Sequence, residues 1–120
     1  MAMQHNNRND IEEVELSIEE AQKNIDKMEA LNRLRQNKDF KELIEVGYLQ
    51  DEASRTVLAK AEPALQSDEQ QRILDNMINS IGYFRQYLNK IYQFGNQSSR
   101  AIDEHRNTRD ELRNEAEQRH

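Results

Sequence analysis

The chain has 120 residues, a net charge of −6 and no cysteine, and 33% of its residues are charged against 35% that are hydrophobic. The acidic balance disfavours nonspecific binding to nucleic acid, and the absence of cysteine excludes disulfides, thiolate metal sites and a cysteine nucleophile. One proline and three glycines leave little room for the turns that an all-β fold needs.

The N-terminal residues 1–9 are polar and predict a disordered arm before one elongated helical domain, residues 10–120. This arm lacks the hydrophobic stretch of a signal peptide. No apolar run approaches the roughly 20 residues that span a bilayer. We therefore expect no membrane association and a cytoplasmic setting.

The first helix is predicted over residues 10–36. Asp10 and Glu13 resemble a capping box, with Asp in place of the usual Ser or Thr. Its apolar positions follow a 3-4-3-4-3 spacing, which is typical of a coiled-coil seam. These positions are Ile11, Val14, Ile18, Ala21, Ile25 and Met28. Such a seam must be covered by another helix, because a bare stripe of this length invites aggregation.

Short helices are predicted over residues 39–62. Asp39 and Glu42 resemble a second cap, and Gly47 is expected to end the first of these helices. Pro63 disfavours helix at the preceding Glu62, so the segment should end there.

The third helix is predicted over residues 68–118, because Ser67 and Gln70 fit the Ser-x-x-Gln capping box. Its apolar positions keep one phase at spacings of three and four. They are Leu74, Met77, Ile81, Phe84, Leu88 and Ile91, and the same register reaches Gly95, Ser98, Ile102, His105, Arg109, Leu112 and Ala116. At 95–99 we expect either a kink or a place where a partner backbone comes close.

The run "IGYFRQYLNKIYQFG", residues 81–95, holds five of the seven aromatic residues. Phe84 lies on the seam, and we expect most of the run to be core, with Tyr83, Tyr87 and Phe94 widening the apolar face. The alternative is that these last three form a protein-binding patch. Stacking on nucleic acid ranks third, because two isolated cations in an acidic chain attract phosphate weakly.

No catalytic, cofactor or metal site is predicted. The histidines His5, His105 and His120 are far apart in sequence, and the Glu-x-x-His spacing of di-iron bundles occurs once, at Glu117 and His120. The serines are explained by caps and helix surfaces, and no glycine-rich phosphate loop exists. We therefore expect a protein that is not an enzyme.

The predicted fold class is all-α: an antiparallel helical hairpin or coiled coil with a small helical head and no sheet. The expected core of the head is Leu31, Leu34, Phe40, Leu43, Ile44, Val57, Leu58, Leu74, Met77, Ile78 and Ile81. The arm after Gly95 could pair with the first helix of its own chain or zip against a second copy. The candidate partner-binding residues are Ile11, Val14, Ile18, Ile25, Tyr83, Tyr87, Phe94, Ile102 and Leu112.

The runs "LNRLRQNKDFKELIEVGYLQDEASRTVLAKAEPALQSDEQQ" and "IGYFRQYLNKIYQFG" resemble a group of small helical proteins of tailed bacteriophages. These are prefoldin-like in outline, with terminal helices that pair around a central section. The likeness covers about residues 30–115. The middle of this chain reads as helix where prefoldin has β-hairpins, so a prefoldin-type oligomer built through hairpins is not expected. The resemblance implies a non-enzymatic phage protein that serves particle assembly.

Three functions follow as hypotheses. The first is a phage assembly protein, either a chaperone-like or scaffolding factor or a minor virion component, which acts in the host cytoplasm or in the virion. Its partners would be a phage structural protein, further copies of itself as a homo-oligomer, or both. The second is a small acidic inhibitor of a host protein, suggested by the acids of residues 12–20 and 103–117. The third, DNA binding, is disfavoured because acids interleave the basic residues.

Overall fold

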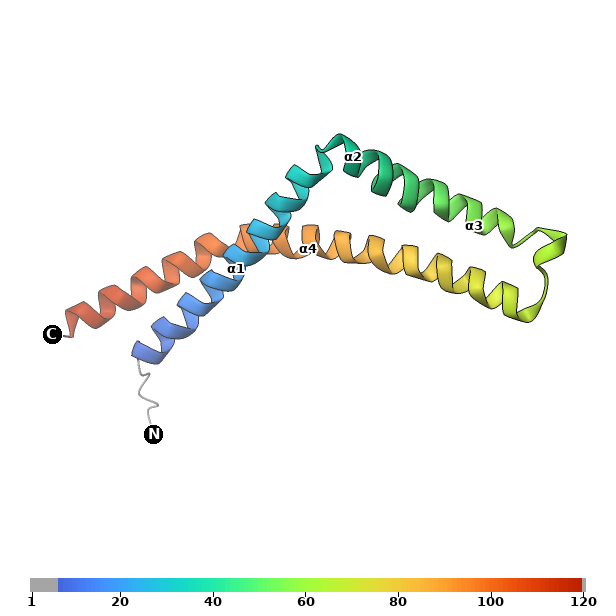
Figure 1. Ribbon diagram of the computed structural model, residues 1–120. Helices are drawn as coiled ribbons and strands as arrows, with labels where there is room; N and C mark the ends of the chain where they lie inside the picture. Colours follow the sequence, from blue (N-terminus) through green and yellow to red (C-terminus); the bar gives the residue numbers. More distant parts are fainter. Residues whose placement is uncertain (1–6, 120) are drawn as a thin grey trace. The chain divides into compact units, whose positions relative to one another are not determined.

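The computed structural model describes residues 7–119 (Figure 1). Its elements are α1 (Asn7–Arg35), α2 (Lys38–Phe40), the π-helix η1 (Lys41–Glu52), α3 (Ala53–Ala59), the short 3-10 helix η2 (Pro63–Leu65) and α4 (Asp68–Gln118). No strand occurs within 7–119, so the all-α fold class is confirmed.

The first helix begins at Asn7, so the expectation of a cap at Asp10 and a disordered arm through residue 9 is wrong. Asp10 lies inside the first turn, where a carboxylate still interacts favourably with the helix dipole. The rest of the predicted arm, residues 1–6, and His120 lie outside the described residues.

The chain divides into two compact units, and the expectation of a single helical domain stays a prediction. The first comprises Met1–Glu29 with Ile91–His120, and the second is Ala30–Lys90. The long helix α4 contributes its C-terminal half to the first unit and its N-terminal half to the second.

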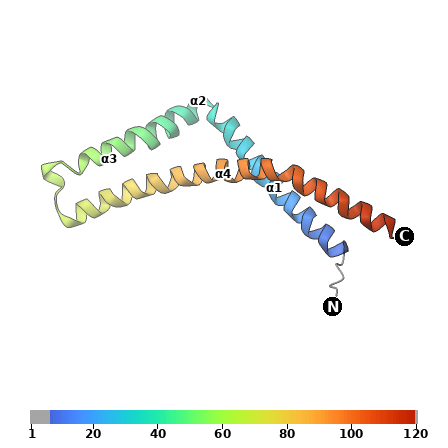
Figure 2. The ribbon, with the colours of Figure 1, turned by 180° about the vertical axis from the view of Figure 1, so that it is seen from behind.

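In the first unit, α1 and the C-terminal half of α4 lie side by side (Figures 1 and 2). Asn24 is hydrogen-bonded to Ser98, whereas the earlier Glu15 is paired with the later Arg113. The two helices are therefore antiparallel. The C-terminal arm packs within its own chain, which was one of the two arrangements that the seam allowed.

Gly95 is buried where these two helices meet. A Cβ atom built on it would lie 2.5 Å from Met28 Cβ and 2.7 Å from Met28 Sδ. Helix α4 is continuous through 95–99. The close neighbour found at Gly95 agrees with the second of the two alternatives drawn from the sequence.

In the second unit, the segment formed by α2, η1 and α3 runs alongside the N-terminal half of α4 (Figure 2). The rings of Tyr48 and Phe84 pack edge to face, with centroids 5.9 Å apart. Lys60 is ion-paired with Asp75 at the far end of the segment. These contacts join the segment to α4 at its middle and at its C-terminal end.

The cap of this segment is Asn37, not Asp39 as predicted. The Asn37 side chain accepts a hydrogen bond of 3.0 Å from the Phe40 N–H. Asn accepts at a helix start as well as Asp does, and Asp39 falls in the first turn instead.

The prediction that Gly47 ends a helix is wrong, because the chain passes through it as a π-helix to Glu52. A Cβ atom at Gly47 would lie 2.9 Å from the Glu42 carbonyl oxygen. The missing side chain therefore relieves crowding inside the helix rather than permitting a turn.

Ser67 and Gln70 form the predicted capping box. The Gln70 N–H donates to Ser67 Oγ at 3.1 Å, and the Ser67 N–H donates back to Gln70 Oε1 at 3.3 Å. The preceding turn is set by Glu62, which is extended before Pro63, as expected.

The predicted head core is only partly buried. Leu31 and Ile81 are buried, and Phe40, Ile44, Leu74 and Ile78 are half-buried. The expectation is wrong for five residues that are exposed: Leu34, Leu43, Val57, Leu58 and Met77. One helical segment against one helix covers a single side of each, so apolar residues off that side remain in water.

Adding a methyl group at two glycines tests the close approach. Gly95→Ala should lower the free energy of unfolding by about 1–3 kcal/mol, because Met28 Cβ cannot move without its helix. Gly82, which has no atom within 4 Å of the added Cβ, is the matched control. Gly82→Ala should raise stability by up to about 1 kcal/mol through helix propensity. Thermal unfolding followed by circular dichroism measures both, and equal stabilisation by the two changes would contradict the contact.

Candidate interaction surfaces

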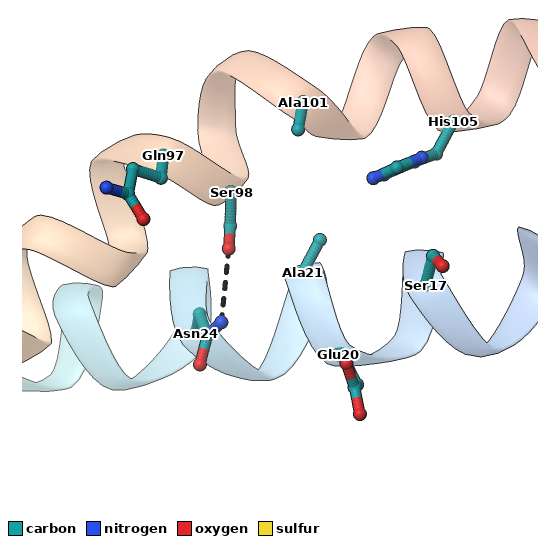
Figure 3. Close-up of a pocket in the computed structure, with 8 residues that line it drawn as sticks. All are labelled: Ser17, Glu20, Ala21, Asn24, Gln97, Ser98, Ala101 and His105. Atoms are coloured by element: carbon teal, nitrogen blue, oxygen red, sulfur yellow. Dashed lines mark hydrogen bonds between the residues drawn. The ribbon is translucent and has the colours of Figure 1, made fainter.

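The centre of the α1–α4 contact in the first unit is polar. Asn24 Nδ2 donates a hydrogen bond to Ser98 Oγ at 3.2 Å (Figure 3). Ser98 is 9% exposed, so its hydroxyl needs a partner of this kind. A hydrogen bond between two inward-facing side chains favours one register of the antiparallel pair over its neighbours.

A shallow groove follows this hydrogen bond, with a volume of about 230 Å³. It is lined by Ser17, Glu20, Ala21, Asn24, Gln97, Ser98, Ala101 and His105. The His105 ring points toward α1 near Ser17 and Ala21, whereas Glu20 points away from α4 (Figure 3). The groove is therefore the polar part of a helix seam, and its one titratable ring occupies a core-facing position.

Metal chemistry has no support in this groove. Across residues 7–119, no three His, Asp or Glu side chains are grouped closely enough to hold a metal ion. Within the same range, no helix is long and apolar enough to cross a membrane. The absence of enzymatic activity stays a prediction.

An ion pair lies beside the seam nearer the ends of the two helices. Arg113 Nη2 donates to Glu15 Oε1 at 2.6 Å, and Ile18 and Arg109 line the same shallow groove. Both side chains of the pair are about half exposed, at 51% and 43%. An ion pair with this much solvent exposure contributes at most about 1 kcal/mol to the free energy of unfolding. It therefore helps to select the register of the two helices rather than to stabilise the fold.

Six of the nine candidate partner-binding residues belong to the first unit's seam. Ile102 is 6% exposed, and the others are half-buried. The half-buried ones are Ile11, Val14, Ile18, Ile25 and Leu112. Because α4 already accompanies α1, these residues form the intrachain core and leave little surface for a partner.

The remaining three candidates are exposed. Tyr83 is 69% exposed, Tyr87 59% and Phe94 48%, so the expectation that they widen the core is wrong. The seam residues of the same run behave as predicted, with Ile81 buried and Phe84 half-buried. The three aromatic residues are four and seven positions apart, which places them beside the seam. A single neighbouring helix covers the seam itself and leaves these flanking positions exposed.

Two exposed apolar residues of the head are functional candidates that sequence reasoning assigned to the core. Leu43 and Leu58 are each 71% exposed. Leu58 and Val57 line an apolar depression on α3 together with Ala53 and Ser54. The sequence carried no sign of this exposure, because the same spacing describes a buried stripe and an uncovered one.

No protein-family model, curated protein or solved structure matches this chain.

Replacing the inward-facing histidine tests whether the groove is part of the core. His105→Leu should raise the free energy of unfolding by about 1 kcal/mol, because a half-buried apolar side chain replaces a polar one. Asn107→Leu, at an exposed position on the same turn, is the control and gains helix propensity alone. Chemical unfolding by urea measures both variants. An equal or smaller gain for His105→Leu would show that the site is not core-like.

Proposed function

We propose that this chain is a non-enzymatic protein of tailed bacteriophages that works through helix-mediated contacts in particle assembly. It would act in the host cytoplasm as a chaperone-like or scaffolding factor, or in the particle as a minor virion component. Its partners would be a phage structural protein and further copies of itself. The proposal assigns no residue a catalytic role.

The observation that carries the proposal is the ratio of covered to uncovered apolar side chains. Among the described residues, four hydrophobic residues are buried: Ala21, Leu31, Ile81 and Ile102. Eleven large hydrophobic residues in the same range are exposed. Single exposed apolar residues are ordinary, but a helical segment with several of them presents the surface that partner proteins cover.

The head supplies the best docking surface for a partner protein. Leu43, Val46, Val57 and Leu58 are exposed on η1 and α3, within 16 residues of chain. An amphipathic partner helix could bury these side chains, and full burial of one such residue is worth about 1.5–3 kcal/mol. The phage setting follows from the resemblance of the runs at residues 31–71 and 81–95.

The alternative function, an acidic inhibitor of a host protein, gains support from one face of α1. Glu12, Glu13, Glu19 and Glu20 are exposed and make no ion pair within residues 7–119. The C-terminal acids support it less well, because Asp103 and Asp110 are ion-paired with Arg106 and Arg109. A basic groove would therefore meet one acidic helix face rather than two.

A capture experiment tests the function. The immobilised chain should enrich a capsid, portal or tail protein from an infected-cell lysate. The double variant Leu43→Glu, Leu58→Glu should no longer capture this phage protein, because charged side chains replace the apolar contacts. Gln36→Glu, Gln50→Glu adds the same charge at exposed polar positions and should keep the partner. Mass spectrometry identifies the captured protein. A host nucleic-acid enzyme that is released by high salt would favour the inhibitor instead, and capture unaffected by the leucine changes would refute the surface.

A further inference from the structure

Helix α4 carries a second stripe of side chains besides the seam. Its members follow a 4-3-4-3 spacing, which places them on one face of the helix, and all are exposed. We name this stripe the aromatic face: Asn76, Ser80, Tyr83, Tyr87 and Lys90. No acid occurs between Asp75 and Asp103, and Lys90 makes no ion pair within residues 7–119. The face is thus two tyrosines with one unneutralised cation.

Helix α1 carries a face of opposite character. Its members surround Leu16, which is 60% exposed. We name it the acidic face: Glu12, Glu13, Leu16, Glu19 and Glu20. No basic residue occurs between Arg8 and Lys23. The neighbouring Glu15 is neutralised by Arg113, but in the described range the four glutamates of the face have no cation paired with them.

We infer that the aromatic face of one copy docks on the acidic face of a second copy. The tyrosine rings would pack against Leu16 while their hydroxyl groups donate hydrogen bonds to the surrounding carboxylates. Lys90 would form an ion pair with one of the glutamates. This ion pair would make the contact specific for the acidic face, because an apolar contact alone does not distinguish one exposed leucine from another. Each face thus supplies what the other lacks.

Charge is the reason for choosing a second copy as the occupant. The chain has a net charge of −6, so most approaches of two copies are repulsive. The acids near the C-terminus are interrupted by Arg106, Arg109 and Arg113, each of which forms an ion pair. The acidic face of α1 has no such interruption, and the aromatic face has no acid. Their pairing brings opposite charges together within an otherwise acidic surface.

The contact joins two different faces. Two copies therefore either pair the faces reciprocally in a closed dimer or repeat the contact head to tail in a larger assembly. This inference rests on the proposed function, which includes self-association, and it names the two surfaces through which copies associate. A crossing of two helices over a few turns buries less than about 1,200 Å², the range of weak interfaces, so the mass should rise with concentration.

Charge reversal on each face tests the pairing by light scattering across a concentration series. The variant Asn76→Glu, Lys90→Glu makes the aromatic face acidic. The variant Glu12→Lys, Glu13→Lys, Glu20→Lys leaves one glutamate among three lysines and makes the acidic face basic. Each variant alone should stay at the mass of one chain, because its two faces now carry like charges. An equimolar mixture should associate again, because both contacts in the mixture pair opposite charges.

The control Glu111→Lys, Glu115→Lys, Glu117→Lys makes the same charge change as the α1 variant at exposed positions near the end of α4 and should keep the wild-type mass. A wild-type chain that remains monomeric at every concentration would overturn the inference. Charge-reversal variants that keep the wild-type mass would also overturn the inference. That result would not affect the proposed function, which the capture of a phage protein tests separately. Loss of association by the Asn76, Lys90 variant alone, without rescue in the mixture, would show that the aromatic face pairs with itself.

Discussion

The close antiparallel contact of α1 with α4 is the constraint on which the rest of the structure depends. Gly95 lies against Met28, and the nearby Ala21 and Ser98 are small and buried, so the two backbones approach closely. Small side chains make such an approach possible, and one added methyl group would meet Met28 Cβ at 2.5 Å. Because this contact covers the isoleucine stripe of α1, any partner must use the outer faces of the helices.

A structure of paired helices has little interior, and this fact links the fold to the proposed function. Each helix has one covered side, so burial is limited to a narrow line of residues. The first unit adds a polar contact to that line, Asn24 with Ser98, and an ion pair beside it, Glu15 with Arg113. The second unit leaves Leu43 and Leu58 in water. A partner that covered these side chains would stabilise the folded chain, which is what the proposed assembly function requires.

Local and periodic signals were readable in the sequence. The box at Ser67 and Gln70 needs only neighbouring residues, and the 3-4 spacing of α4 correctly marked Ile81 and Ile102 as inward-facing. Features that depend on tertiary contact were not readable. The π-helix at Gly47 is a matter of backbone register, and the exposure of Leu58 and Tyr83 depends on how far a neighbouring helix extends. Whether the seam closes within one chain was left open by the pattern, because both arrangements bury the same residues.

The most direct test of the account is a cross-link between the two hydrogen-bonded positions of the seam. The chain contains no cysteine, so Asn24→Cys, Ser98→Cys places a unique thiol pair where the side chains now meet at 3.2 Å. A short thiol cross-linker applied to a dilute solution should join residues 24 and 98 within single chains, as read by denaturing gel and peptide mass spectrometry. Cross-links that form only between chains, or not at all, would contradict the intrachain pairing of α1 with α4.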